Sequence, residues 1–168
     1  MVQRAYRPAR PCQTGSEAMP AQPYDPSSEV TEEQRTKTLQ ELEGQDWGEP
    51  NFPSHLVTTC QALRRKPLRD FTVEDLRIML GQNIGLSYLL PLAREHLRRD
   101  PLVAGDYDPG DLLAAVLLVE PSFWQEQPQL RKAVQEIVDP LTPLPEDLYV
   151  SRSLRKSLEQ ALQNFQHP

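Results

Sequence analysis

The sequence predicts an all-α fold: a compact multi-helix single domain over residues 37–168, preceded by a disordered N-terminal tail over residues 1–36. Apolar residues recur at intervals of three and four along most of the range 37–168, which is the spacing of one helix face. Ser, Thr and Asp precede several of these stretches, at the position of a helix N-cap. No alternating polar and apolar stretch of useful length indicates a β-strand. With 168 residues and 38% hydrophobic content, the chain can bury one core of ordinary size.

The tail is predicted from its composition. Residues 1–36 are rich in Pro, Gln, Ser and Thr and poor in large aliphatic side chains. Such a segment has little apolar surface to bury, so burial cannot offset the entropy lost on ordering it. We therefore expect residues 1–36 to be flexible and the helical domain to begin near residue 37.

The first helices after the tail are expected to be short. The range 38–43 predicts a helical turn that ends at Gly44, because glycine is common just after a helix C-terminus. Ser54 can cap the next helix, which Pro67 ends. One apolar stripe at helical spacing is expected on that helix, made of Leu56, Cys60 and Leu63.

The strongest start signal lies at Thr72. Asp75 follows three residues later, as in a capping box, and Phe71 and Leu76 occupy the two positions of a hydrophobic staple. Gly81 is expected to stop this helix as its C-cap.

The range 81–85, Gly-Gln-Asn-Ile-Gly, could be a phosphate cradle or a corner between two helices. It lacks the Lys-Ser/Thr pair of a P-loop, and no strand precedes it with the spacing of a dinucleotide-binding fingerprint. The same residues are explained by a glycine C-cap followed by a tight corner. Gln82 and Asn83 would then form hydrogen bonds with backbone groups that lack a partner at the helix end. We therefore expect the corner to be scaffold.

A second run of helices follows the corner. Pro91 is tolerable if it falls in the first turn of the next helix. Asp108 and Pro109 resemble a capping residue and a first helical residue, and the apolar range 112–119 after them predicts the central buried helix. Ser122 and Pro128 begin shorter helices. The apolar face of the helix after the corner is Leu86, Leu89, Leu90, Ala93 and Leu97, and that of the last helix is Leu154, Leu158, Leu162 and Phe165.

Charge and cysteine content limit the classes of partner. The formal net charge of -6 disfavours binding to nucleic acid or to an anionic membrane, since both need a basic face. Cys12 and Cys60 are the only cysteines, which does not indicate a disulfide framework and fits a reducing cytoplasm. The longest apolar run, 112–119, is too short to cross a bilayer, and the N-terminus lacks the apolar segment of a secretory signal. A cytoplasmic protein with a basic protein partner is the expectation.

One group of carboxylates could form a chemical site. Asp106, Asp108 and Asp111 could gather a metal cation, and a metal-dependent hydrolase is the alternative that they support. Their loop lacks the full series of oxygen ligands and the terminal Glu of an EF-hand loop. No His or other residue that could activate a water molecule lies nearby in the sequence. No nucleophile, base and orienting group come together elsewhere. We expect no enzymatic activity, no metal and no cofactor.

Aromatic and acidic residues gather instead in the predicted loops. Any one Trp or Phe ring could pack on the helical core. Trp and Tyr ringed by carboxylates also describe a surface for a basic protein partner. The residues expected to bind that partner are Trp47, Glu49, Asp106, Tyr107, Asp108, Asp111, Phe123 and Trp124.

Three ordered motifs resemble a known family. They are "DWGEP", "LRRKPLRDFTVEDLRIMLGQNIGLSYLLPLAREHL" and "DPLVAGDYDPGDLL". Together they closely resemble the immunity proteins of contact-dependent growth inhibition (CDI) systems, over roughly residues 37–135. The Pro-rich tail departs from that pattern, and the segment after Asp139 does not match it.

The resemblance implies a small cytoplasmic inhibitor that binds the toxin domain of a large exported adhesin-toxin protein. The implied mechanism is stoichiometric occlusion, with the acidic loops covering the toxin's active site. Were the toxin a nuclease, the carboxylates would stand in for phosphates and speed association. The alternative from another class is a helical adaptor or regulator that binds a different cytosolic protein.

Overall fold

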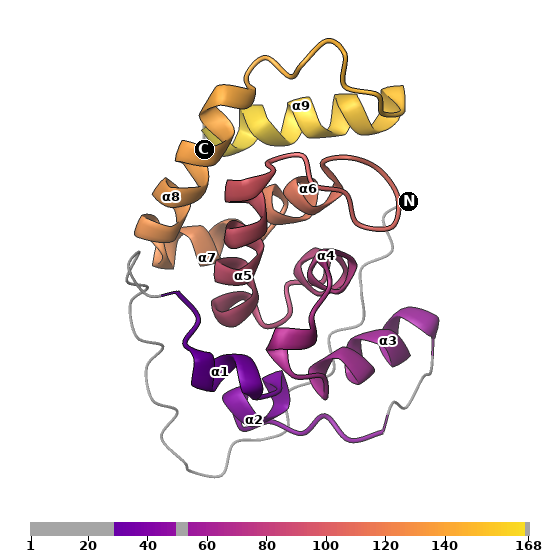
Figure 1. The fold of residues 1–168 in the computed structure, drawn as a ribbon, viewed down its shortest axis with the longest axis vertical. Helices are drawn as coiled ribbons and strands as arrows, with labels where there is room; N and C mark the ends of the chain where they lie inside the picture. The colour runs from indigo at the N-terminus through magenta and orange to yellow at the C-terminus, as the bar shows by residue number, and fades with distance from the viewer. Residues whose placement is uncertain (1–28, 50–53, 167–168) are drawn as a thin grey trace.

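The computed structural model describes residues 29–49 and 54–166, and these are helical, as predicted, with no β-strand (Figure 1). Two isolated β-bridges, Thr38 with Pro67 and Ala104 with Pro109, are the extended pairings among them. The elements are α1 (Glu32–Thr36), α2 (Leu39–Glu43), α3 (His55–Arg64), η1 (Leu68–Asp70), α4 (Val73–Gly81), α5 (Leu86–Arg99), α6 (Asp111–Leu117), α7 (Pro121–Glu126), α8 (Pro128–Val138), η2 (Asp139–Leu141) and α9 (Arg152–Gln166).

One hydrophobic core runs through the whole described region. Helix α4 packs on α3, α5 and α6, and α9 covers α6 and α8. Figure 1 shows α5 and α6 between the N-terminal helices α1–α3 at one end and α8 and α9 at the other. The large side chains that are fully buried are almost all leucines: Leu39, Leu68, Leu76, Met79, Leu80, Leu89, Leu90, Leu97, Leu112, Leu113, Leu130 and Leu158.

Local capping explains several helix ends. Thr72 accepts a hydrogen bond from Asp75 N, and the Asp75 carboxylate accepts one from Thr72 N, which is the predicted capping box. Phe71 and Leu76 on either side of it are buried. Gly44 ends α2 in the left-handed conformation, with φ 62°. These ends were predictable because each depends on residues close in sequence.

The folded region begins earlier than the predicted boundary at residue 37. Helix α1 lies within the range expected to be tail, and Thr31 and Gln34 form a capping box at its start. Val30 is buried in the core, and Arg35 Nη2 donates to Glu95 Oε1 of α5 over 2.6 Å. These contacts provide the stabilisation that composition alone did not indicate. The rest of the predicted tail, residues 1–28, lies outside the described residues.

The corner between α4 and α5 differs in detail from the expectation. Gly81 is the last residue of α4 and Gln82 is the C-cap, whereas the left-handed residues are Asn83 (φ 55°) and Gly85 (φ 66°). Asn83 Oδ1 accepts a hydrogen bond from Glu120 N at 3.0 Å, which ties the corner to the start of α7. The glycine that needs its conformational freedom is therefore Gly85 and not Gly81.

Two expectations about α5 and α3 are corrected. Pro91 is the sixth residue of α5 and not in its first turn, because the helix begins at Leu86. Leu56 is exposed on α3, and the buried stripe there is Cys60, Leu63 and Arg64.

The central helix α6 is shorter than its apolar run. It is capped by Gly110, with φ 85°, and not by Asp108, because the backbone turns through the glycine immediately before Asp111. The helix ends at Leu117, so Leu118 projects outward and is 69% exposed, while Val119 returns to the core.

Candidate functional site

The structure divides the eight predicted site residues among three places. Trp47 and Glu49 lie in the loop between α2 and α3, four others lie in or just after the loop between α5 and α6, and the remaining two lie on α7. Only some of them are on the surface. Trp47, Glu49, Asp106 and Tyr107 are exposed, Asp108 and Phe123 are half-buried, and Asp111 and Trp124 are buried.

The α2–α3 loop is held by Arg64, whose side chain is almost fully buried at 2% exposure. Arg64 Nη1 donates to Glu43 Oε2 at 2.5 Å, and Nη2 donates to the Gln45 carbonyl at 3.0 Å. The same guanidinium lies 4.1 Å from the centre of the Trp47 ring. A buried guanidinium bonded in this way fixes the first part of the loop, residues 43–47, and its cation–π contact orients the indole.

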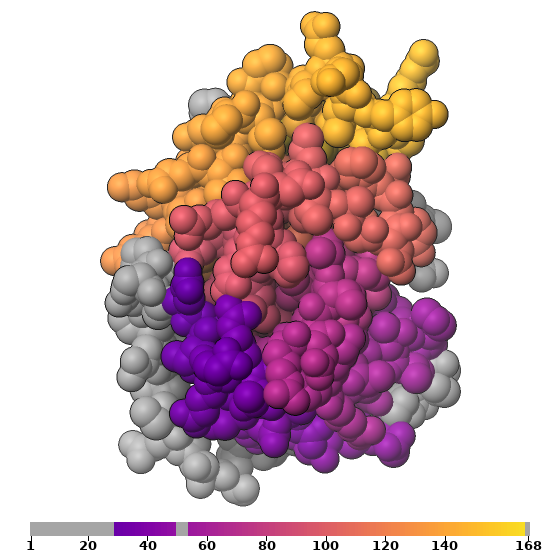
Figure 2. All heavy atoms as spheres, viewed as in Figure 1, coloured from indigo at the N-terminus to yellow at the C-terminus, as the bar shows by residue number. Residues whose placement is uncertain are grey.

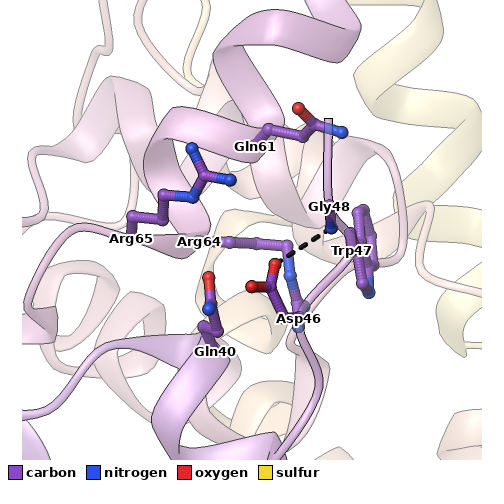
Figure 3. A pocket seen from close by; sticks show the side chains of 7 residues that line it. All are labelled: Gln40, Asp46, Trp47, Gly48, Gln61, Arg64 and Arg65. Carbon is purple, nitrogen blue, oxygen red and sulfur yellow. Dashed lines mark hydrogen bonds between the residues drawn. The ribbon is translucent and has the colours of Figure 1, made fainter. Parts of the chain in front are cut away.

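A shallow recess lies beside this arginine (Figure 3). Figure 3 shows the Arg64 side chain reaching between Asp46 and the Trp47 ring, and Asp46 Oδ1 accepts a hydrogen bond from Gly48 N at 2.9 Å. The recess holds about 160 Å³ of empty space, open to solvent. Small-molecule sites are usually roughly 300–1,000 Å³. The recess is therefore a shallow surface depression and not an enclosed small-molecule site.

Trp47 and Glu49 face outward from that loop. The indole is 37% exposed, with one face against Arg64 and the remainder towards solvent. Glu49 lies 3.7 Å from Arg65, but both side chains are well exposed. Exposed ion pairs of this kind stabilise a fold little, so the Glu49 carboxylate can accept a new partner at small cost.

The α5–α6 loop rests on a cluster of carboxylates and one arginine. Arg77 Nε and Nη2 donate to the two Glu74 carboxylate oxygens at 2.7 and 2.5 Å. The Glu74 carboxylate also accepts from Asp106 N at 3.1 Å, while Asp111 Oδ1 accepts from Gly105 N at 2.7 Å. These bonds attach the loop to α4 and to the first residue of α6.

Gly105 lies directly against two carboxylates. A Cβ placed there would lie 2.5 Å from Glu74 Oε2 and 3.0 Å from Asp111 Oδ2. The two carboxylates thus converge on the glycine backbone, and Arg77 Nε lies 3.8 Å from Asp111 Oδ2. The hydrogen bond from Arg77 holds the pKa of Glu74 below its ordinary value, against the effect of burial. Both carboxylates serve the loop's internal structure.

Tyr107 is the outward-facing member of this loop. Its side chain is 76% exposed, and the Arg77 guanidinium lies 5.1 Å from the centre of its ring. Asp106 beside it is exposed as well. The loop therefore presents one aromatic ring and one carboxylate, whereas the buried Asp111 cannot meet a partner directly.

The α7 pair is divided between core and surface. Trp124 is buried and makes edge-to-face contacts with Phe123 and Phe165, with ring centres 5.7 and 5.3 Å apart. Its position corrects the expectation that Trp124 lies on a binding surface, because the C-terminal helix α9 covers it. Trp124 packs on the helical core, which was the alternative expected for any one of the Trp and Phe rings.

The arginines that hold these loops were missed by sequence reasoning. Arg64 follows Cys60 by four positions and therefore lies on the buried face of α3, which was a usable signal. Arg77 follows Glu74 by three positions, a spacing that brings helical side chains together. Neither arginine was assigned a role from the sequence, although their positions place them on or beside the buried face.

Other kinds of site find little support in the part of the chain that the structure describes. Residues 29–49 and 54–166 contain no group of three or more His, Cys, Asp or Glu side chains that could hold a metal ion. None of the described helices is long and apolar enough to cross a membrane.

Comparison with known families gives one match. A family model described as CDI immunity proteins matches residues 41–134, which is more than half of the chain and includes both loops. No curated protein matches the chain.

Proposed function

The chain belongs to the CDI immunity proteins, and from this premise we propose that it binds one cognate toxin domain and neutralises it by covering the toxin's active site. The toxin domain would be the C-terminal part of a large exported adhesin-toxin protein, met in the cytoplasm of the cell that makes the inhibitor. An inhibitor of this kind works by stoichiometric binding, so it needs a rigid, complementary surface and no catalytic group.

The observation that carries the proposal is the exposed Tyr107, held over Arg77 in a loop that hydrogen bonds fix to α4. A large aromatic ring with 76% of its surface in water contributes little to the fold. Aromatic side chains placed on rigid loops are the residues that most often dominate the free energy of protein association. Tyr107 is thus the best candidate for an anchor, with Trp47 as the second.

The exposed carboxylates beside these rings determine the kind of partner. Asp106 flanks Tyr107, and Glu49 lies two residues from Trp47. Their charges, on a chain with net charge -6, favour a toxin surface that is basic. A basic groove that holds the phosphates of a nucleic-acid substrate would complement these carboxylates. A nuclease is therefore the class of toxin that the charges support best.

The test uses the toxin domain encoded by the gene next to this one, with its active site inactivated by substitution. Calorimetry and binding kinetics are measured for wild type, Tyr107→Ala and Glu49→Gln at low and high salt. Wild type should bind one to one. Tyr107→Ala should lose about 2 kcal/mol of binding free energy, mainly through faster dissociation. Glu49→Gln should slow association and reduce its salt dependence.

Leu118→Ala is the matched control, because it truncates another exposed apolar side chain, at the end of α6. It should bind like wild type, and every variant should keep the wild-type melting temperature. Wild type that fails to bind or to inhibit the active toxin would refute the proposed function. Unchanged affinity in both Tyr107→Ala and Glu49→Gln would place the interface on another surface.

A further inference from the structure

We infer that the toxin-binding face extends beyond the family-matched segment onto residues 145–150, named here the C-terminal arch, with Tyr149 as a further aromatic anchor. The inference rests on the proposed function and adds a part of the surface to it. The arch connects η2 to α9 and follows residue 134, the last residue of the match. It is therefore a feature by which this chain can discriminate its own toxin from others.

Tyr149 is the most exposed large hydrophobic side chain in the described residues, at 95%. Such a ring gains almost nothing from the fold, since it is as open to water as it would be in an unfolded chain. Two exposed carboxylates, Glu146 and Asp147, precede it in the same arch. An aromatic ring beside acidic groups repeats the composition of the Tyr107 loop.

Arg155, at the start of α9, holds the arch in place by hydrogen bonds to its backbone. Its Nη2 donates to the carbonyls of Pro145 at 2.8 Å and Leu148 at 3.0 Å, and it reaches that of Glu146 at 3.5 Å. A segment fixed in this way loses little conformational entropy when a partner binds. The binding free energy from its exposed ring is therefore not offset by a cost of ordering the segment.

The core also anchors the arch on the N-terminal side of Tyr149. Leu144, just before it, is buried, and Leu148 within it packs partly against the core. The side chain of Tyr149, next to Leu148, therefore projects outward while the backbone before it stays attached. Arg155 and the two leucines form the framework, and Tyr149 is left free for a partner.

The arch lies near the Tyr107 loop. Gly110, at the end of that loop, is so close to α9 that a Cβ there would lie 3.2 Å from Leu158 Cδ2, one turn after Arg155. Figure 2 shows the salmon segment between α5 and α6 directly below the orange and yellow C-terminal segment. The proposed face runs from Tyr107 to Tyr149, and the packing of Gly110 on α9 is the contact that joins the two segments.

The chemistry of the arch favours the basic toxin over other occupants. A second copy of this chain carries the same net charge of -6 and would bring like charges together. A protein surface that carries lysines or arginines around an apolar pocket meets both the ring and the two carboxylates.

The experiment measures dissociation rates of the full-length protein from the inactivated toxin domain. The variants are Tyr149→Ala, Arg155→Ala, the double variant, and Tyr149→Phe. Tyr149→Ala should raise the dissociation rate about thirtyfold, which corresponds to the roughly 2 kcal/mol loss typical of an anchor residue. Tyr149→Phe should stay within about threefold of wild type, because the ring remains.

Arg155 acts here as a positioning residue, and the double variant tests that role. If Arg155 works by presenting Tyr149, the double variant should dissociate little faster than Tyr149→Ala alone. Fully additive effects would show that Arg155 only stabilises the fold. Wild type that binds the toxin while Tyr149→Ala dissociates at the wild-type rate would overturn the inference and leave the proposed function standing. Loss of binding by wild type would overturn both.

Discussion

Gly85 allows a quantitative test of how the corner between α4 and α5 is built. Its φ of 66° lies in the left-handed region, and a Cβ there would lie 2.8 and 2.9 Å from the two methyl carbons of Leu39. Leu39 is fully buried, at 0% exposure, so its side chain cannot move aside into solvent. The substitution Gly85→Ala should therefore strain the backbone and overpack the core at the same time.

The expected loss follows from these two effects. A left-handed conformation costs an L-residue roughly 1–2 kcal/mol, and overpacking a filled core costs about 1–3 kcal/mol. Gly85→Ala should thus lower the free energy of unfolding by about 2–5 kcal/mol, and the melting temperature by at least roughly 5 °C. Urea and thermal unfolding of the full chain, followed by circular dichroism, measure both quantities.

Gly81 provides the matched control four residues away. It is the last residue of α4, its φ is not left-handed, and apart from its chain neighbours and the backbone of its own helix no atom lies within 4 Å of the position of its Cβ. Gly81→Ala should keep the wild-type stability or gain up to about 1 kcal/mol, because alanine favours the helix. If Gly81→Ala destabilised the protein more than Gly85→Ala, the geometric argument would be wrong.

Two further predictions concern helix α4. Thr72→Ala should lower the free energy of unfolding by about 1 kcal/mol, since it removes the side chain of the capping box, and Thr72→Ser should restore most of it in the same urea titration. Glu74→Gln tests linkage to pH. Because Arg77 lowers the pKa of Glu74 in the folded state, the carboxylate stabilises the fold above its ordinary pKa, and this contribution is lost as pH falls through the lowered value. Wild type should exceed Glu74→Gln in stability at neutral pH, and the two should converge in strong acid; a gap independent of pH would contradict this.

The sequence predicted those parts of the fold that depend on neighbours in the chain. Thr72 and Asp75 are three residues apart, so their capping box could be predicted from spacing alone. Gly85 shows the opposite case. The sequence offered two glycines for the left-handed backbone of the corner. Gly85 adopts it, together with Asn83, and the distant Leu39 packs against Gly85. No local pattern contains that information.

The candidate site was predictable in composition but not in geometry. The exposure of Tyr107 agreed with the expectation of an acidic-aromatic loop, whereas Trp124 entered the core because α9 supplies Phe165 as a partner. Arg64 and Trp47 are 17 positions apart, and their contact depends on how α3 folds back on the loop. Tyr149 lies outside the recognised motifs, so neither pattern nor resemblance drew attention to it.

The division of the acidic side chains between structure and surface bears on how fast the toxin would be captured and how long it would be held. Glu43, Glu74 and Asp111 are occupied by arginines or backbone amides within the protein, so they contribute little field to an approaching partner. The carboxylates left on the surface beside the aromatic rings are few, such as Glu49 and Asp106. Salt should therefore affect the association rate only moderately. The lifetime of the complex should depend chiefly on how firmly the arginines beneath the loops hold the aromatic rings in place.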